Sequence, residues 1–469
     1  MLVTRPLPGL VPMHGLGGQQ DLPIPLTLAV AAAVAALVVS FSVLTLAWRT
    51  PRYQGARGGR AVPAVLARLV DSAGFACFLR AFGLLATAYL TWALVAGPDL
   101  VVNPALGVFY VLVWVGLVPA SLLLGPVVRA LSPVRTLNLL LARATGGDPS
   151  TGLVQYPAQL GYWPAAVGLF GFVWQELVNP QSTYLDTVRL WLAVYFALML
   201  VGAAVFGDVW LRRADPFEVY STLLSKLSFW GRDDTGRLVV RSPLANLSTV
   251  SSRPGLVAVV AVLFGSTAFD SFKDTLTWLR LVERIGGSAV LLDTLALIAF
   301  CAVVALSFTV AAMSTGLDPG AATGTDPALQ RDQDDGAGQV VVRRRELPRL
   351  LAHSVLPIIV GYMTAHYLSY LIEQGQRTLI QLSDPLVRGD NYLGTANLSV
   401  NYWLSFHPTL LASIKVLAVV TGHIVGVVAV HDRSLRLLPP RHQVVGQLGM
   451  LVVMVGYTAT GLYLLMGAA

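Results

Sequence analysis

Ionisable side chains interrupt several long apolar segments of this sequence. A charged group inside a bilayer costs at least about 2.5 kcal/mol on insertion scales, so each of these residues needs a partner or a purpose. At similar depths lie three acids, one histidine and one lysine, namely Glu176, Asp270, Asp293, His366 and Lys415. Two further imidazoles belong to the same level: His407 stands at the start of the segment that carries Lys415, and His14 precedes the first apolar segment.

Imidazoles and carboxylates at one depth suit a divalent transition metal such as zinc, copper or iron. The candidate metal ligands are His14, His366 and His407. A water bound to such a metal becomes a nucleophile at neutral pH. The candidate catalytic residues around it are Glu176, Asp270, Asp293 and Lys415. The chain contains neither HExxH nor a CxxC pair, so the ligand spacing has no recognised form.

The alternative for the same residues is purely structural. Lys415 then pairs with Asp293 or Glu176, and His366 hydrogen-bonds across a helix interface.

Further histidines lie toward the opposite ends of the segments. A haem between His353 or His366 and His423 is stereochemically possible, although no motif demands it. Gly422 and Gly426 flank His423 in a GxxxG pattern, which favours close approach of a neighbouring helix over metal ligation.

The composition explains why these residues must lie in a membrane. Of 469 residues, 55% are apolar and only 12% are charged, with a mean hydropathy of +0.67. A soluble domain carries about a quarter charged residues. These values exclude a soluble enzyme and a disordered scaffold, and two cysteines exclude a disulfide framework. We therefore expect an all-α, polytopic integral membrane helical bundle.

About ten segments reach the length of a membrane-spanning helix. They are 25–48, 74–97, 105–128, 163–178, 189–211, 255–270, 288–312, 348–372, 408–430 and 444–467, of which 163–178 and 255–270 are short. Every second connection is basic: 49–80, 129–162, 212–254, 313–350 and 431–443 hold 24 of the 32 Lys and Arg residues. The positive-inside rule places these connections in the cytoplasm and both termini outside.

The chain then divides into four parts. Residues 1–24 form an outer N-terminal segment, 25–312 a seven-span part, 313–347 a flexible cytoplasmic linker, and 348–469 a three-span part. Within 212–254, the run Asp215-Pro216-Phe217-Glu218 predicts a helix start, followed by an apolar face typical of a helix on the cytoplasmic membrane surface. Residues 231–240 predict a hairpin.

Common catalytic motifs are missing from the sequence. It has no GxxxxGK[ST] loop for nucleotide-driven pumping and no GxSxG elbow. A net charge of +7 is typical of basic cytoplasmic loops and does not indicate nucleic-acid binding. The basic residues are almost all arginine, which favours a GC-rich bacterial genome and hence the bacterial plasma membrane.

Several stretches together resemble a known family. They are His14–Gly18, Asp21–Pro25, residues 161–177, Asp215–Tyr220 with Trp230–Arg232, Thr364–Tyr367, and Gly422-His423 with His431–Arg433. This set resembles the bacterial membrane-protein family labelled fenitrothion hydrolase, from about residue 13 to 440. The resemblance implies hydrolysis of an organophosphorus triester, in some systems together with a second membrane protein. It assigns no catalytic residue.

Three functions remain open on the sequence. The first is a metal-dependent hydrolase with an outward-facing site reached by an apolar triester from the bilayer. The second is a transporter or channel in which the intramembrane acids form an ion or proton path. The third is a non-catalytic subunit of a membrane complex that binds partners through 212–254 and 314–347.

Overall fold

The computed structural model describes residues 19–53, 55, 58–314, 323–324, 340–341, 343–438 and 443–466. In this part of the chain, eight helical segments are long and apolar enough to cross a membrane. They are α1 (Leu26–Ala47), α3 (Ala73–Ala96), α9 (Leu185–Phe206), α13 (Leu256–Lys273), α15 (Ala289–Met313), Arg344–Gln381 with α18 (Leu356–Gln381), α19 (Pro408–Leu437), and Val445–Met466 with α20 (Leu448–Met466). The all-α polytopic fold is confirmed.

A ninth crossing is bent. It comprises α4 (Pro104–Gly107), the π-helical segment Val108–Val115 and α5 (Leu117–Leu124), with an angle of 49° at the break. Pro119 lies in the first turn of α5 and has no N–H to donate to the preceding turn, which explains a break at this point. The remaining predicted crossing corresponds to α8 (Trp163–Leu177), which at 15 residues is shorter than a full span.

Lipid is the solvent that the outer helices require. Only 6% of the apolar window of α3 and 11% of that of α15 is buried inside the protein. Both helices would expose an apolar surface to water, which soluble proteins avoid. The bilayer predicted from composition is therefore supported by the way these helices are placed.

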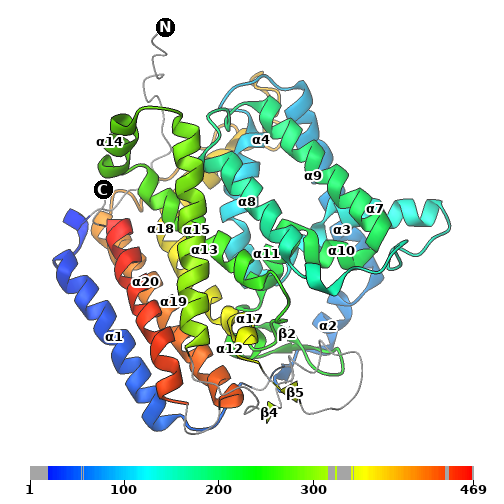
Figure 1. Ribbon diagram of the computed structural model, residues 1–469. Coiled ribbons are helices and arrows are strands. Elements are labelled where there is room, and N and C mark those ends of the chain that lie inside the picture. The colour runs from blue at the N-terminus through cyan, green and yellow to red at the C-terminus, as the bar shows by residue number, and fades with distance from the viewer. Residues whose placement is uncertain are drawn as a thin grey trace.

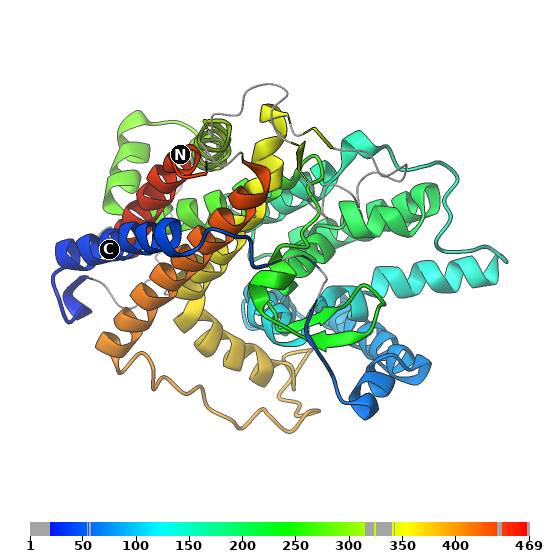
Figure 2. The same cartoon turned by 90° about the horizontal axis from the view of Figure 1, so that it is seen from below.

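The two long halves of the chain form one bundle. Figure 1 and Figure 2 show α1 and α20 on one flank and α3 and α9 on the other, with α8, α13 and α18 between them. Helices α18 and α19 pack together most extensively, and α1, α13 and α15 also contact the C-terminal helices. One hydrophobic core runs through all of them. The division at 313–347 is a division in sequence that the packing does not follow.

Short elements complete the fold. The helices are α2 (Ala64–Val70), α6 (Val127–Leu131), α7 (Pro133–Ala144), α10 (Asp208–Ala214), α11 (Pro216–Ser225), α12 (Pro243–Leu247), α14 (Leu276–Ile285) and α17 (Leu347–Leu351). The strands are β1 (Arg60–Ala61), β2 (Trp230–Arg232), β3 (Leu238–Val240), β4 (Thr323–Gly324) and β5 (Val340–Val341). Apart from β4 and β5, most of the predicted linker lies outside the described residues.

The helix predicted after residue 215 forms, but in a different environment. Asp215 caps α11 by accepting hydrogen bonds from the backbone N–H groups of Phe217 and Glu218, as its N-cap pattern predicts. Nine of the ten residues of α11 are buried, against α5, α6, α8 and α10. The helix is therefore internal, and the prediction of a helix on the membrane surface is wrong. The apolar face was real, but protein covers it.

The predicted hairpin is confirmed. Strands β2 and β3 pair antiparallel, with Trp230 opposite Val240 and Arg232 opposite Leu238. Asp233 organises the turn by accepting hydrogen bonds from the backbone N–H groups of Thr235 and Arg237. Strand β1 adds to the free edge of β3, so the loop after α1 is tied to this hairpin.

Candidate functional site

A buried cluster of polar side chains lies between α8, α13 and α18. Asp270 and Lys273 come from the last turn of α13, and His366 and Tyr367 come from the middle of α18. Asp270 is 3% exposed and His366 is 5% exposed. Polar groups buried to this extent in a membrane protein are stable only with partners, and each of them has one.

Asp270 is the centre of the cluster. Its Oδ2 atom lies 2.9 Å from His366 Nε2 and accepts a hydrogen bond of 2.8 Å from the Tyr367 hydroxyl. Its Oδ1 atom lies 3.5 Å from Lys273 Nζ. The lysine and the aspartate are three residues apart, so they share one face of α13. The carboxylate is thus held by two neighbouring residues of α18 and by its own helix.

His366 has a hydrogen-bond partner on each ring nitrogen. Nε2 meets Asp270, and Nδ1 lies 3.1 Å from Ser271 Oγ. The Ser271 hydroxyl in turn accepts from the Tyr362 hydroxyl at 3.0 Å and reaches the Thr267 carbonyl at 3.1 Å. Ser271 can therefore give its single proton either to the imidazole or to the carbonyl of its own helix.

This arrangement accommodates two protonation states of His366. In the neutral ring, Nε2–H donates to Asp270 and Nδ1 accepts from the Ser271 hydroxyl. In the protonated ring, Nδ1–H donates to Ser271, whose hydroxyl then turns to Thr267. Neither pattern leaves a ring nitrogen unpaired, so both fit the same packing of α13 and α18.

Glu176 is the second acid at this level. It lies near the end of α8, and its Oε2 atom is buried without a hydrogen-bond partner among the described residues. The charges of Asp270 and Lys273 both act on it. Two carboxylates around one lysine can share its charge, and a proton on either acid relieves their mutual repulsion.

The other candidate residues lie elsewhere. Asp293 accepts a hydrogen bond of 2.8 Å from Trp278 Nε1, which joins α15 to α14. Lys415 is 1% exposed on α19, where the charge of Asp21 acts on it, and no ion pair of the described residues joins it to Asp293 or Glu176. The structural alternative is thus confirmed for His366, which bonds across the α13–α18 interface, and not for Lys415.

Two of the three predicted metal ligands lie in the part of the chain that the structure describes, and of these only His366 belongs to the cluster. His407 is exposed, with Nδ1 at 2.7 Å from the Trp403 carbonyl and its ring 4.3 Å from that of Trp403. His14 lies outside the described residues. Among the residues that the structure describes, no three His, Cys, Asp or Glu side chains converge as metal ligands. A metal site that includes His14 stays a prediction.

Two further imidazoles, those of His353 and His423, have structural surroundings. His353 and His423 each place Nδ1 against a nearby backbone carbonyl, that of Leu350 at 3.1 Å and that of Val419 at 2.8 Å. The GxxxG pattern around His423 lies at a close helix contact, as its spacing predicts. A Cβ on Gly422 would lie 2.5 Å from the Pro357 carbonyl oxygen, and one on Gly426 would lie 2.8 Å from that of Ser354. Gly422 therefore allows α19 to touch α18, and Gly426 allows it to touch the turn just before α18.

Sequence reasoning missed Lys273, Ser271 and Tyr367 as members of the cluster. The predicted span 255–270 ends at Asp270, which places the lysine one turn later in the outer loop. The spacing of three residues between Asp270 and Lys273 was the available signal. No signal in the sequence predicted that Ser271 and Tyr367 join the cluster, because their contacts depend on how α13 and α18 are rotated against each other.

A second buried polar group fixes α11. Arg135 makes a bidentate ion pair with Glu218, at 2.5 and 2.8 Å, and reaches Asp208 at 3.2 Å. Burial raises the pKa of Glu218, and the Arg135 guanidinium opposes that rise. Burial also raises the pKa of Asp215 to about 7, against the two backbone N–H groups that it caps. These groups link α7, α10 and α11 and have a structural role.

Comparison with known proteins finds no matching family model, no matching curated protein and no matching solved structure. Function must therefore be argued from the residues themselves.

Proposed function

We propose that this protein is a transporter or channel of the bacterial plasma membrane that moves protons through the Asp270–His366 cluster. The observation that supports it most directly is the pair of complete hydrogen-bond patterns available to His366. A group that is fully partnered with and without its proton can pass that proton on. Intramembrane acids with such partners are typical of proton relays.

The donors in the neutral state all point toward Asp270. Tyr362 donates to Ser271, Ser271 to His366, and His366 to Asp270. A proton that arrives at Nδ1 of the ring is therefore balanced by release of the Nε2 proton to the carboxylate. Lys273, with 23% of its side chain exposed, and the nearby Glu176 offer the next positions toward the outer side.

The experiment is proton flux in proteoliposomes that contain a pH-sensitive dye, driven by a potassium diffusion potential. We expect flux well above that of empty vesicles, and at least a tenfold reduction in Asp270→Asn and in His366→Gln. Asp293→Asn is the matched control, since it removes an equivalent intramembrane acid outside the cluster. Flux equal to that of empty vesicles, or wild-type flux in Asp270→Asn, would contradict the proposal.

The alternative function is the organophosphorus hydrolysis that the family resemblance implies, in which Asp270 and His366 would support a metal-assisted reaction instead. It would add His14 and His407 as ligands for zinc, copper or iron. Elemental analysis with a visible spectrum distinguishes the two functions. One or two metal ions per chain that are lost in His366→Ala, together with triester turnover, would favour hydrolysis; a haem band would indicate electron transfer. Co-purification of a second membrane protein would favour the subunit role.

A further inference from the structure

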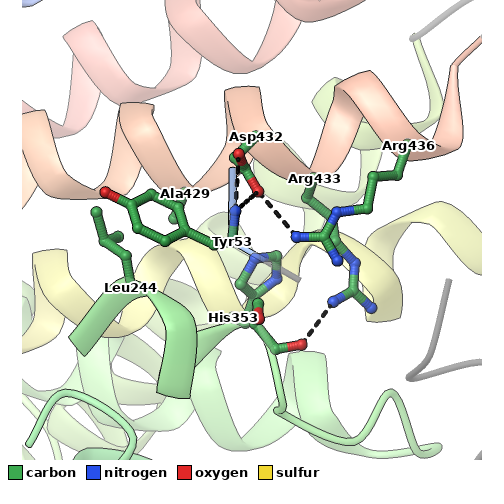
Figure 3. A pocket seen from close by; sticks show the side chains of 8 residues that line it. Tyr53, Leu244, His353, Ala429, Asp432, Arg433 and Arg436 are labelled. Carbon is green, nitrogen blue, oxygen red and sulfur yellow. Dashed lines mark hydrogen bonds and ion pairs between the residues drawn. The ribbon is translucent and has the colours of Figure 1, made fainter. Parts of the chain in front are cut away.

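A small cavity lies at the end of α19 that is predicted to face the cytoplasm, far along the helix from Lys415. Its volume is about 10 Å³. Figure 3 shows the side chains that surround it, which come from the loop after α1, from α12 and the residue after it, from the start of the α18 segment and from α19. They are Tyr53, Leu244, Ser248, His353, Ala429, Asp432, Arg433 and Arg436.

Asp432 is the one acid among these lining residues, and its oxygens are already occupied. The backbone N–H of Arg52 donates to Oδ1 at 2.6 Å, and that of Tyr53 lies 3.3 Å from Oδ2. Arg436 Nη2 donates to Oδ2 at 2.8 Å. The carboxylate therefore offers little to a further donor in the cavity.

Arg436 leaves two donors available. Only 8% of the Arg436 side chain is exposed, yet its Nε and Nη1 atoms have no hydrogen-bond partner among the described residues. The neighbouring Arg433 is 2% exposed, and its Nη1 donates to the Ser248 carbonyl at 3.0 Å. Buried polar groups in proteins are almost always paired, so open N–H groups on a buried guanidinium call for an acceptor.

We propose that this cavity binds one halide-sized monovalent anion, such as chloride. The cavity is small, so a monatomic anion fits it better than a phosphate or a carboxylate group. Two guanidinium groups and one carboxylate line it, so the cationic groups are in excess. The open groups on Arg436 are donors, and a halide is an acceptor without a proton of its own.

Such an anion would act as a structural link. The lining residues belong to four segments that are far apart in the sequence, and Asp432 already ties the loop after α1 to α19. An anion held by Arg436 beside them would stabilise the folded bundle by binding it in preference to the unfolded chain. This inference is independent of the proposed proton path, because none of the lining residues belongs to the Asp270–His366 cluster.

The test compares thermal unfolding of the detergent-purified full chain in sodium chloride, sodium bromide and sodium gluconate at equal ionic strength. We expect the midpoint to be about 2 °C or more higher in either halide salt. Arg436→Gln should lose this difference. Arg349→Gln is the matched control, since Arg349 also has a buried Nε without a partner among the described residues but does not line the cavity.

Chloride-35 NMR line broadening on the wild-type protein gives a second readout that needs no variant. Broadening that bromide removes would support the site even if Arg436→Gln failed to fold. Equal midpoints in chloride and gluconate without such broadening would overturn it and leave an ordered water as the occupant. Sulfate that raises the midpoint as much as chloride would overturn the assignment to a halide.

Discussion

Gly361 on α18 and Gly422 on α19 are in contact, backbone against backbone. A Cβ atom on Gly422 would lie 3.2 Å from the Cα atom of Gly361. This contact sits about one and a half turns from His366 along α18, so it fixes the depth and the rotation of the helix that presents the imidazole to Asp270. The candidate site therefore depends on two residues that have no side chains.

Gly422→Ala should destabilise the protein. Its new methyl group would lie 2.5 Å from the Pro357 carbonyl oxygen, which is backbone and cannot rotate away. We expect a loss of about 1–3 kcal/mol, measured as the thermal midpoint in detergent. Gly456→Ala on α20 is the control, since a Cβ there meets no atom within 4 Å. Equal midpoints for the two variants would show that α18 and α19 do not touch.

Glu218→Gln should cost far more than a surface substitution of the same kind. The glutamate is 2% exposed and holds Arg135 in a bidentate pair, so its loss leaves a buried guanidinium with only the more exposed Asp208 as an ionic partner. We expect the free energy of unfolding to fall by about 3–5 kcal/mol. Asp71→Asn breaks a pair in which both partners are about half exposed, and such surface pairs contribute little to stability. Similar losses in the two variants would contradict the buried position of α11.

Stability should fall between pH 6 and 8 in a way that depends on Asp215. Its pKa is about 7 in the folded protein, above the ordinary value of 3.8, because burial disfavours the charge. Above pH 3.8 the folded state therefore holds a proton that the unfolded state has released, so stability falls as pH rises toward 7 and levels off once the folded carboxyl is also ionised. The expected loss is about 1 kcal/mol between pH 6 and 8.

Asp215→Asn is the matching variant for that measurement. Asparagine caps a helix as well as aspartate and carries no charge, so the variant should keep α11 and show a flatter pH profile. Because burial also raises the pKa of Glu218, the quantity to compare is the difference between the wild-type and variant profiles. Parallel profiles would mean that Asp215 is ionised throughout.

The orientation in the membrane can be measured with single cysteines in a background without Cys77 and Cys301. A cysteine at Thr235, in the β2–β3 turn, should react with an impermeant maleimide only after the membrane is opened. A cysteine at Leu398, which is 61% exposed in the loop between α18 and α19, should react from outside. The reverse pattern would invert the orientation and place the Asp270–His366 cluster toward the cytoplasm.

Features that depend on neighbouring residues in the chain were predictable from the sequence. The cap at Asp215, the β2–β3 hairpin and the close contact at Gly422 each follow from residue types within a few positions of one another. The membrane-spanning segments follow from apolar length alone, which lipid imposes on every helix that crosses it. Once these segments are known, any ionisable residue within one of them is identified as costly to bury.

Tertiary structure decided which of those residues meet. Composition and spacing contain no information on the rotation of α13 against α18, and that rotation places His366 between Asp270 and Ser271 while Lys415 and Asp293 lie elsewhere. The tertiary structure also decided that protein, and not lipid, covers the apolar face of α11. The sequence cannot distinguish the two, because lipid and a neighbouring helix favour the same apolar residues. Depth in the membrane is a local property of the chain, whereas partnership is a property of the packed bundle.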